Sequence, residues 1–176
     1  MPFTLETGSG TPGANAYISA TFFVDYHTTR GRSLIDPDTD AQWTTGQIEA
    51  AIVVASDFLD AKFRYVGIRE KVEQGREWPR TNAFYADDGR VADGVPIEVQ
   101  EACAELAVRQ LSAEIAPDPT YDASLRPVER TLEQVGPIRE EIEFAEGGHP
   151  IMFKAYPIAE RKMKYLLVTG NFVERV

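Results

Sequence analysis

The chain has 176 residues and a formal net charge of −10 at pH 7. Hydrophobic residues make up 43% and charged residues 26%, which is typical of a globular chain with a buried core and argues against disorder throughout. The negative charge argues against general affinity for duplex DNA, because such affinity comes mainly from Lys and Arg on phosphates. A single cysteine excludes an internal disulfide, and no apolar run approaches the roughly 18 residues that cross a membrane. With no signal-peptide pattern at the start, we expect a soluble protein of a reducing cytoplasm.

The first part of the chain predicts a lead-in and a short helix. Residues 1–13 are rich in glycine and have no apolar period, so we expect a flexible segment. Ser19 is a suitable N-cap for a helix that ends at Gly31.

Two longer helices are predicted in the middle of the chain. Thr44 and Gln47 have the spacing of a capping box, in which each side chain satisfies a free backbone N–H of the other. Apolar residues then repeat at helical spacing, at Ile48, Ile52, Ala55, Leu59 and Phe63. The next helix starts near Pro96, carries Cys103 on its apolar stripe, and ends before the two prolines of APDP.

Beyond residue 120 the pattern changes from helix to strand. Apolar and charged residues alternate from Ile138 to Phe144, which is typical of a half-buried strand, and the preceding Val-Gly-Pro allows a bend or a hairpin. A last short helix is predicted from Ile158 to Leu167. The fold expected is therefore mainly α, a small bundle of three to four helices with a C-terminal β-strand or hairpin and a short terminal helix.

We expect a helical core domain over residues 14–120 and a linker with a strand-and-helix extension over 121–176. Three prolines and polar residues between Ala116 and Arg130 indicate the linker. The extension is expected to dock to partners; the alternative is that it folds back as one more layer of the core.

The sequence offers little for catalysis. His27 and His149 have no metal-ligand spacing, and they are expected at a helix end or surface and in a turn, respectively. Cys103 is expected to be a small buried apolar residue. No nucleophile elbow, phosphate loop or dinucleotide motif is present. We therefore expect no enzyme, no cofactor and no metal site.

Residues 62–80 hold six basic and three acidic residues in an otherwise acidic chain. Phe63, Tyr65 and Trp78 are interleaved with the cations, which is the pattern of single-strand binding. The alternative is that Phe63 and Trp78 lie in the core while the arginines form a solvated face or an oligomer contact. The second interpretation is favoured, since Phe63 is in phase with the buried stripe of its helix. Trp78 and Pro79 are then the structural anchor of the loop from 75 to 99.

The order of these pieces resembles a known family. The segments GANAYISATFFVDYHTTRG, IEAAIVVASDFLDAKFRYVGIR and WPRTNAFYADDGRVADGVPIEVQEACAELA, with VGPIREEIEF as a later strand, are similar to the head–tail connector (adaptor) proteins of tailed phages. Some members of that family are labelled DnaT-like single-stranded DNA-binding proteins.

The resemblance implies a structural neck protein of the virion, assembled in the host cytoplasm, that joins the DNA-filled head to the tail. It implies a ring of copies, a dodecamer, that binds the portal protein and a tail or stopper protein, with DNA only passing through and no membrane contact. The alternative is a DnaT-like single-stranded DNA-binding accessory protein of replication. Cations expected at contacts between subunits or with the portal are Arg64, Arg69, Arg80, Arg161, Lys162 and Lys164.

Overall fold

The protein was analysed as a computed structural model that describes residues 2–117, 130–135, 138–143 and 155–168. It divides into two compact units. The first combines Met1–Ile115 with Tyr156–Val176, and the second is Ala116–Ala155. Each unit is described by itself below.

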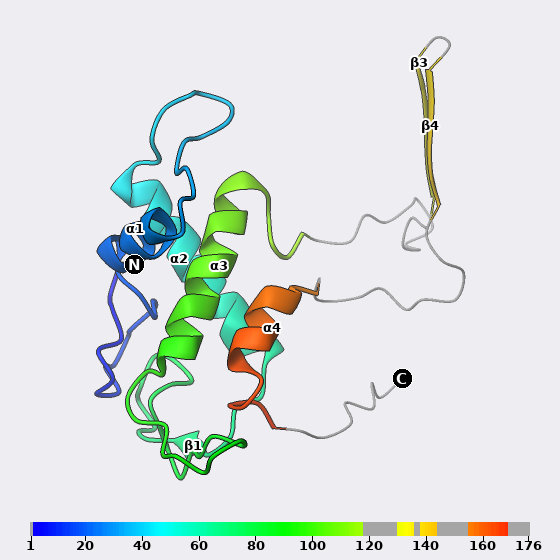
Figure 1. Ribbon diagram of the computed structural model, residues 1–176. Helices are drawn as coiled ribbons and strands as arrows, with labels where there is room; N and C mark the ends of the chain where they lie inside the picture. Colours follow the sequence, from blue (N-terminus) through cyan, green and yellow to red (C-terminus); the bar gives the residue numbers. More distant parts are fainter. Residues whose placement is uncertain (1, 118–129, 136–137, 144–154, 169–176) are drawn as a thin grey trace. The chain divides into compact units, whose positions relative to one another are not determined.

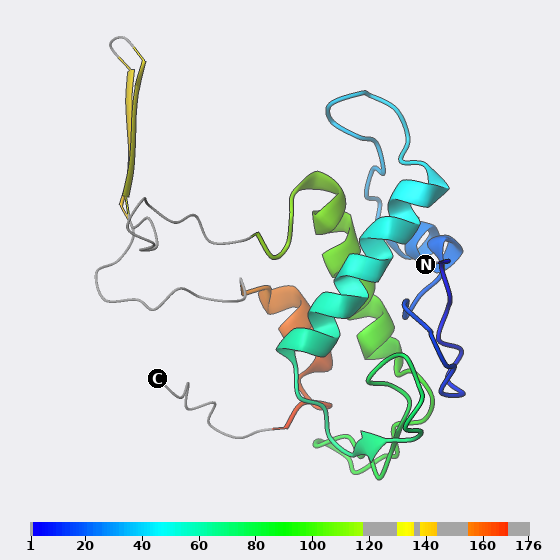
Figure 2. The ribbon, with the colours of Figure 1, turned by 180° about the vertical axis from the view of Figure 1, so that it is seen from behind.

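The first unit is built on helices α1 (Ala20–Thr29), α2 (Thr45–Lys62), α3 (Ile97–Ser112) and α4 (Pro157–Met163). Helix α3 packs against both α2 and α4 (Figure 1). Figure 2 shows the same unit from behind, with α2 lying across α3. The prediction of a mainly helical bundle with a small antiparallel element is confirmed. In the part of the chain that the structure describes, no helix combines the length and apolar character of a membrane span.

Helix α2 starts where its capping box was predicted. The Thr44 hydroxyl accepts from the Gln47 backbone N–H at 3.3 Å, and the Gln47 side-chain oxygen accepts from the Thr44 backbone N–H at 3.0 Å. Its inward face is buried, with Ile52 and Leu59 fully covered. Cys103 of α3 is also fully buried, as predicted, with its Sγ 3.4 Å from the Ser56 hydroxyl.

The long connection between α2 and α3 contains a short antiparallel pair, β1 (Ile68–Arg69) with β2 (Arg80–Thr81). The glycine at position 67 allows the two backbones to come this close, since a Cβ there would lie 2.5 Å from the Thr81 carbonyl oxygen. An isolated bridge between Phe84 and Val91 then closes a second turn.

Helix α4 is shorter than the predicted span of 158–167. It ends at Met163, and the chain then turns so that Leu167 pairs with Tyr65 in an antiparallel bridge. Met163 and Leu166 are buried, which fixes this segment to the first unit. The expected single extension over 121–176 is therefore divided: residues from Tyr156 on belong to the first unit, because Met163 and Leu166 complete its helical core.

The second unit contains β3 (Arg130–Val135) and β4 (Ile138–Glu143), paired antiparallel from Arg130 opposite Glu143 to Val135 opposite Ile138. The predicted strand therefore has a partner strand directly before it in the sequence.

The N-terminal segment has fixed partners, although we expected flexibility there. The buried Glu6 carboxylate accepts four backbone N–H bonds, of 2.7–3.0 Å, from residues 8–11. Gly8 and Gly10 have positive φ angles of 89° and 68° in this loop, a conformation that turns successive N–H groups toward one anion. The carboxylate thus replaces the missing regular hydrogen bonds of the segment.

Candidate nucleic-acid interface

Two of the three aromatic residues of the basic stretch 62–80 are buried, whereas Phe63, which was predicted in the core, is half-buried at the end of α2. Tyr65 is 4% exposed and Trp78 is fully covered. Their rings meet edge to face, with centroids 5.6 Å apart. Tyr65 and Trp78 are therefore not available to stack on bases, and the interleaved pattern reflects core packing at these two positions.

Two arginines of the same stretch are also engaged within the chain. Arg76 pairs with Asp57 at 2.7 Å and with Asp60 at 3.3 Å. Arg80 pairs with Glu77 at 2.6 Å, and it also donates to three backbone carbonyls. Because these guanidinium groups are already neutralised by carboxylates, they attract phosphate weakly.

Asp60 lies at the centre of a buried polar cluster. Its carboxylate accepts from the Tyr17 hydroxyl and from Arg76, and the Tyr17 hydroxyl accepts from the Trp78 backbone N–H at 3.3 Å. Burial raises the pKa of Asp60 to about 6, although the Tyr17 hydrogen bond and the Arg76 charge both lower it. The cluster ties the loop before Trp78 to α2, which is a structural role.

Three cations in the first unit have no hydrogen-bonding or ion-pair partner among the described residues: Arg64, Arg161 and Lys164. All three are exposed. Arg64 follows the end of α2, Arg161 is on α4, and Lys164 follows the end of α4, directly before the exposed aromatic residue Tyr165. We call these four residues the basic edge.

Backbone pairing brings the two segments of the basic edge together. The Val168 N–H donates to the Arg64 carbonyl at 3.0 Å, beside the bridge between Tyr65 and Leu167. The Lys164 ammonium lies 4.2 Å from the centroid of the Tyr165 ring, which is 38% exposed. Cations beside an accessible aromatic ring are the groups that bind a single nucleic-acid strand.

The remaining predicted contact residues have intramolecular partners. Lys162 binds Glu101 at 2.6 Å, and this bond and its contact with Tyr26 raise the pKa of the ammonium more than burial lowers it. Arg69 is 4.0 Å from Glu77. The prediction that Arg161, Lys162 and Lys164 act as one group therefore changes, because Lys162 fastens α4 to α3.

Two of the residues considered for catalysis, His27 and Cys103, lie in the core. His27 lies in the last turn of α1, the helix end considered for it, but it is buried rather than on the surface, and its Nε2 is 3.0 Å from the Ala104 carbonyl. Burial lowers the pKa of His27 and raises the pKa of the Cys103 thiol to about 12. Within the described ranges, no group of three or more potential metal ligands gathers. His149 lies outside the described residues.

The sequence predicts the three cations of the basic edge as contact residues, but it does not predict Tyr165 or the grouping, because Arg64 is about 100 residues from the others in the chain. The run of cations at residues 161–164 is visible in the sequence, whereas the neighbouring position of Arg64 has no local signature. Only the pairing of residues 64–66 with 166–168 shows it.

A family model matches residues 1–176, the whole chain. No curated protein and no solved structure matches the chain significantly. The family match overturns the prediction of a ring-forming virion protein that binds a portal, because the family is described by single-stranded DNA binding. It agrees with the alternative that the sequence left open. The chain belongs to the family described as "Putative DnaT-like ssDNA binding protein".

Proposed function

We propose that this protein binds single-stranded DNA and that the basic edge contacts the strand. The observation that carries the proposal is that Arg64, Arg161 and Lys164 are exposed and have no carboxylate partner among the described residues, with the Lys164 ammonium beside the exposed ring of Tyr165. The family match supports it independently. In this arrangement the cations meet phosphates and the ring stacks on one base.

A single strand suits this surface better than a duplex. A ring such as Tyr165 can stack only on a base whose face is accessible, and duplex bases are already stacked on one another. Duplex DNA also has a higher charge density, so it is repelled more strongly by a chain with a net charge of −10.

The small number of cations sets the expected salt dependence. If three phosphates are neutralised, the logarithm of the binding constant should fall with the logarithm of salt concentration with a slope of about −2, from roughly 0.7 per phosphate. Binding should therefore be modest at physiological salt and tighter at low salt.

The test is fluorescence anisotropy with a labelled oligothymidylate of ~15 nucleotides. The variant combines Arg64→Ala, Arg161→Ala and Lys164→Ala. Its matched control combines Arg30→Ala, Arg69→Ala and Arg90→Ala, which removes the same charge from arginines that have carboxylate partners. We expect the first variant to bind at least tenfold more weakly than the control. Equal binding by the two variants would show that only net charge matters and would reject the basic edge.

Tyr165 is tested separately. Tyr165→Ala should weaken binding about fivefold or more, because stacking on one base contributes roughly 1–3 kcal/mol. Tyr165→Phe keeps the ring and should bind like the unchanged protein. Loss of binding in both variants would indicate that the hydroxyl, rather than stacking, is recognised.

A further inference from the structure

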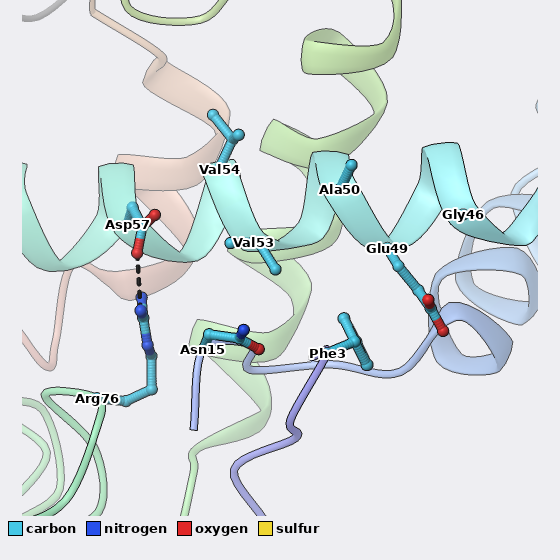
Figure 3. Close-up of a pocket in the computed structure, with 9 residues that line it drawn as sticks. All are labelled: Phe3, Asn15, Gly46, Glu49, Ala50, Val53, Val54, Asp57 and Arg76. Atoms are coloured by element: carbon cyan, nitrogen blue, oxygen red, sulfur yellow. Dashed lines mark hydrogen bonds and ion pairs between the residues drawn. The ribbon is translucent and has the colours of Figure 1, made fainter. Parts of the chain in front are cut away.

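A second surface lies on α2, along the part of the helix that precedes the basic edge. It is an open groove of about 650 Å³ between α2 and the N-terminal segment (Figure 3). Ala50, Val53 and Val54 form its α2 side, and Phe3 lies opposite them. Pockets of this size commonly hold ligands or peptide side chains.

The apolar side of the groove is not part of the core. Ala50, Val53 and Val54 lie three and four positions apart, so they form one face of α2, and Val54 is 38% exposed. The opposite face of the same helix carries the fully buried Ile52 and Leu59. Helix α2 therefore has a second apolar stripe that the described residues of the chain leave accessible.

The charges at the groove are acidic. Glu49 has no cationic partner among the described residues, and the Asp57 side chain is 60% exposed with one oxygen bound to Arg76 (Figure 3). The Arg76 guanidinium lies at the same end, but it is held by Asp57 and Asp60. The groove thus offers carboxylates and no free cation, which repels nucleic acid.

We propose that this groove docks an amphipathic helix of a protein partner, with apolar side chains in the groove and Lys or Arg facing Glu49 and Asp57. The two carboxylates are eight residues apart, or about 12 Å along α2, which corresponds to about two helical turns of a partner. Charge complementarity selects a basic partner, since an acidic helix would place carboxylates against carboxylates.

This inference does not depend on DNA binding. The groove and the basic edge share no residue and have opposite charge preferences. Together they would let one chain hold a strand and a basic protein segment at the same time.

The experiment measures binding of two fluorescent synthetic peptides to the full chain. Each peptide is an amphipathic helix with leucine at positions i, i+3, i+4 and i+7; one has lysines beside this stripe, and the other has glutamates there. We expect the lysine peptide to bind the unchanged protein and the glutamate peptide not to bind. Val54→Gln should weaken binding of the lysine peptide about fivefold or more, because the lost apolar contact is not replaced. Val24→Gln is the matched control, since Val24 is 37% exposed on α1. This variant should bind the lysine peptide as tightly as the unchanged protein does.

A charge reversal makes the test specific. Glu49→Lys should weaken binding of the lysine peptide and strengthen binding of the glutamate peptide. Equal effects of Val54→Gln and Val24→Gln, or no change of preference in Glu49→Lys, would overturn the proposal. If sedimentation instead shows that Val54→Gln turns an oligomer into a monomer, the groove holds a second copy and the proposed partner is wrong. Circular dichroism confirms folding of each variant, and unchanged oligothymidylate binding by Val54→Gln separates this result from any failure of the basic edge.

Discussion

Asp60 should make the stability of this protein decrease as pH rises, and Asp60→Asn should remove that dependence. The carboxyl is largely buried beside Tyr17 and Arg76, with the side chain 18% exposed, and it also accepts from the Glu77 backbone N–H at 3.4 Å. Burial disfavours the charged form more than these partners favour it, so the pKa rises from 3.8 to about 6.

The direction and the magnitude of the pH dependence of stability follow from this pKa shift. Because the folded protein holds the proton more tightly than the unfolded chain, the favourable contribution is complete below pH 3.8 and is lost as pH rises through 6. A shift of about two pKa units corresponds to about 3 kcal/mol in total. Roughly 1.5 kcal/mol of this falls between pH 5 and pH 8, a range that lies above the isoelectric point of 4.7.

The assay is urea unfolding of the unchanged protein and of Asp60→Asn at pH 5 and at pH 8. The difference in free energy of unfolding between the two proteins cancels the other titrating groups. We expect the unchanged protein to lose about 1.5 kcal/mol relative to the variant between these pH values. A constant difference, or a relative gain at pH 8, would refute the dominance of burial over the Arg76 charge.

Three further substitutions test the packing and the caps by unfolding in urea. Trp78→Ala should lower the free energy of unfolding by about 3–5 kcal/mol, as for other large buried aromatic residues. Trp43 is only partly buried, so Trp43→Ala should lower it clearly less. An unchanged unfolding midpoint for Trp78→Ala would reject the role of Trp78 as the loop anchor. Thr44→Ala removes the α2 cap and should cost about 1 kcal/mol, with no loss expected if Gln47 alone holds the first turn. Glu6→Gln weakens the four-N–H carboxylate site and should cost about 2 kcal/mol, and an equally stable variant would show that the neutral amide suffices.

Local signals in the sequence predicted the helices well. The capping box of Thr44 and Gln47 located the start of α2 because it involves residues only three apart. Ser19 likewise caps α1, whose Phe22 N–H donates to it at 3.1 Å. Proline at position 96 marked the start of α3, since a missing N–H is tolerated in a first turn.

Long-range features could not be predicted in this way. The exposed or buried state of Tyr65 depends on Trp78 and on the chain after α4, neither of which affects the local pattern. The ion pairs of Arg76 have no local signature either, because its partners lie on α2, 16 and 19 residues earlier. The alternation of apolar and charged residues from Ile138 to Phe144 indicated a strand, and Val-Gly-Pro allowed a hairpin. The pairing register and the bounds of β3 could not be predicted, because they depend on the geometry of the turn.

The resemblance to connector proteins led to the main functional error. Order and spacing of short motifs can reflect a shared fold, and a fold does not fix a function. The family match favours the alternative, DNA binding, and we propose the basic edge as the surface that contacts the strand.

The most direct test of DNA binding compares the unchanged protein on a labelled oligothymidylate and on a duplex of the same length over a series of salt concentrations. We predict that the single strand binds more tightly at every salt concentration, with a log–log slope of about −2. Failure to bind the single strand even at low salt, or equal affinity for the duplex, would contradict the proposed function.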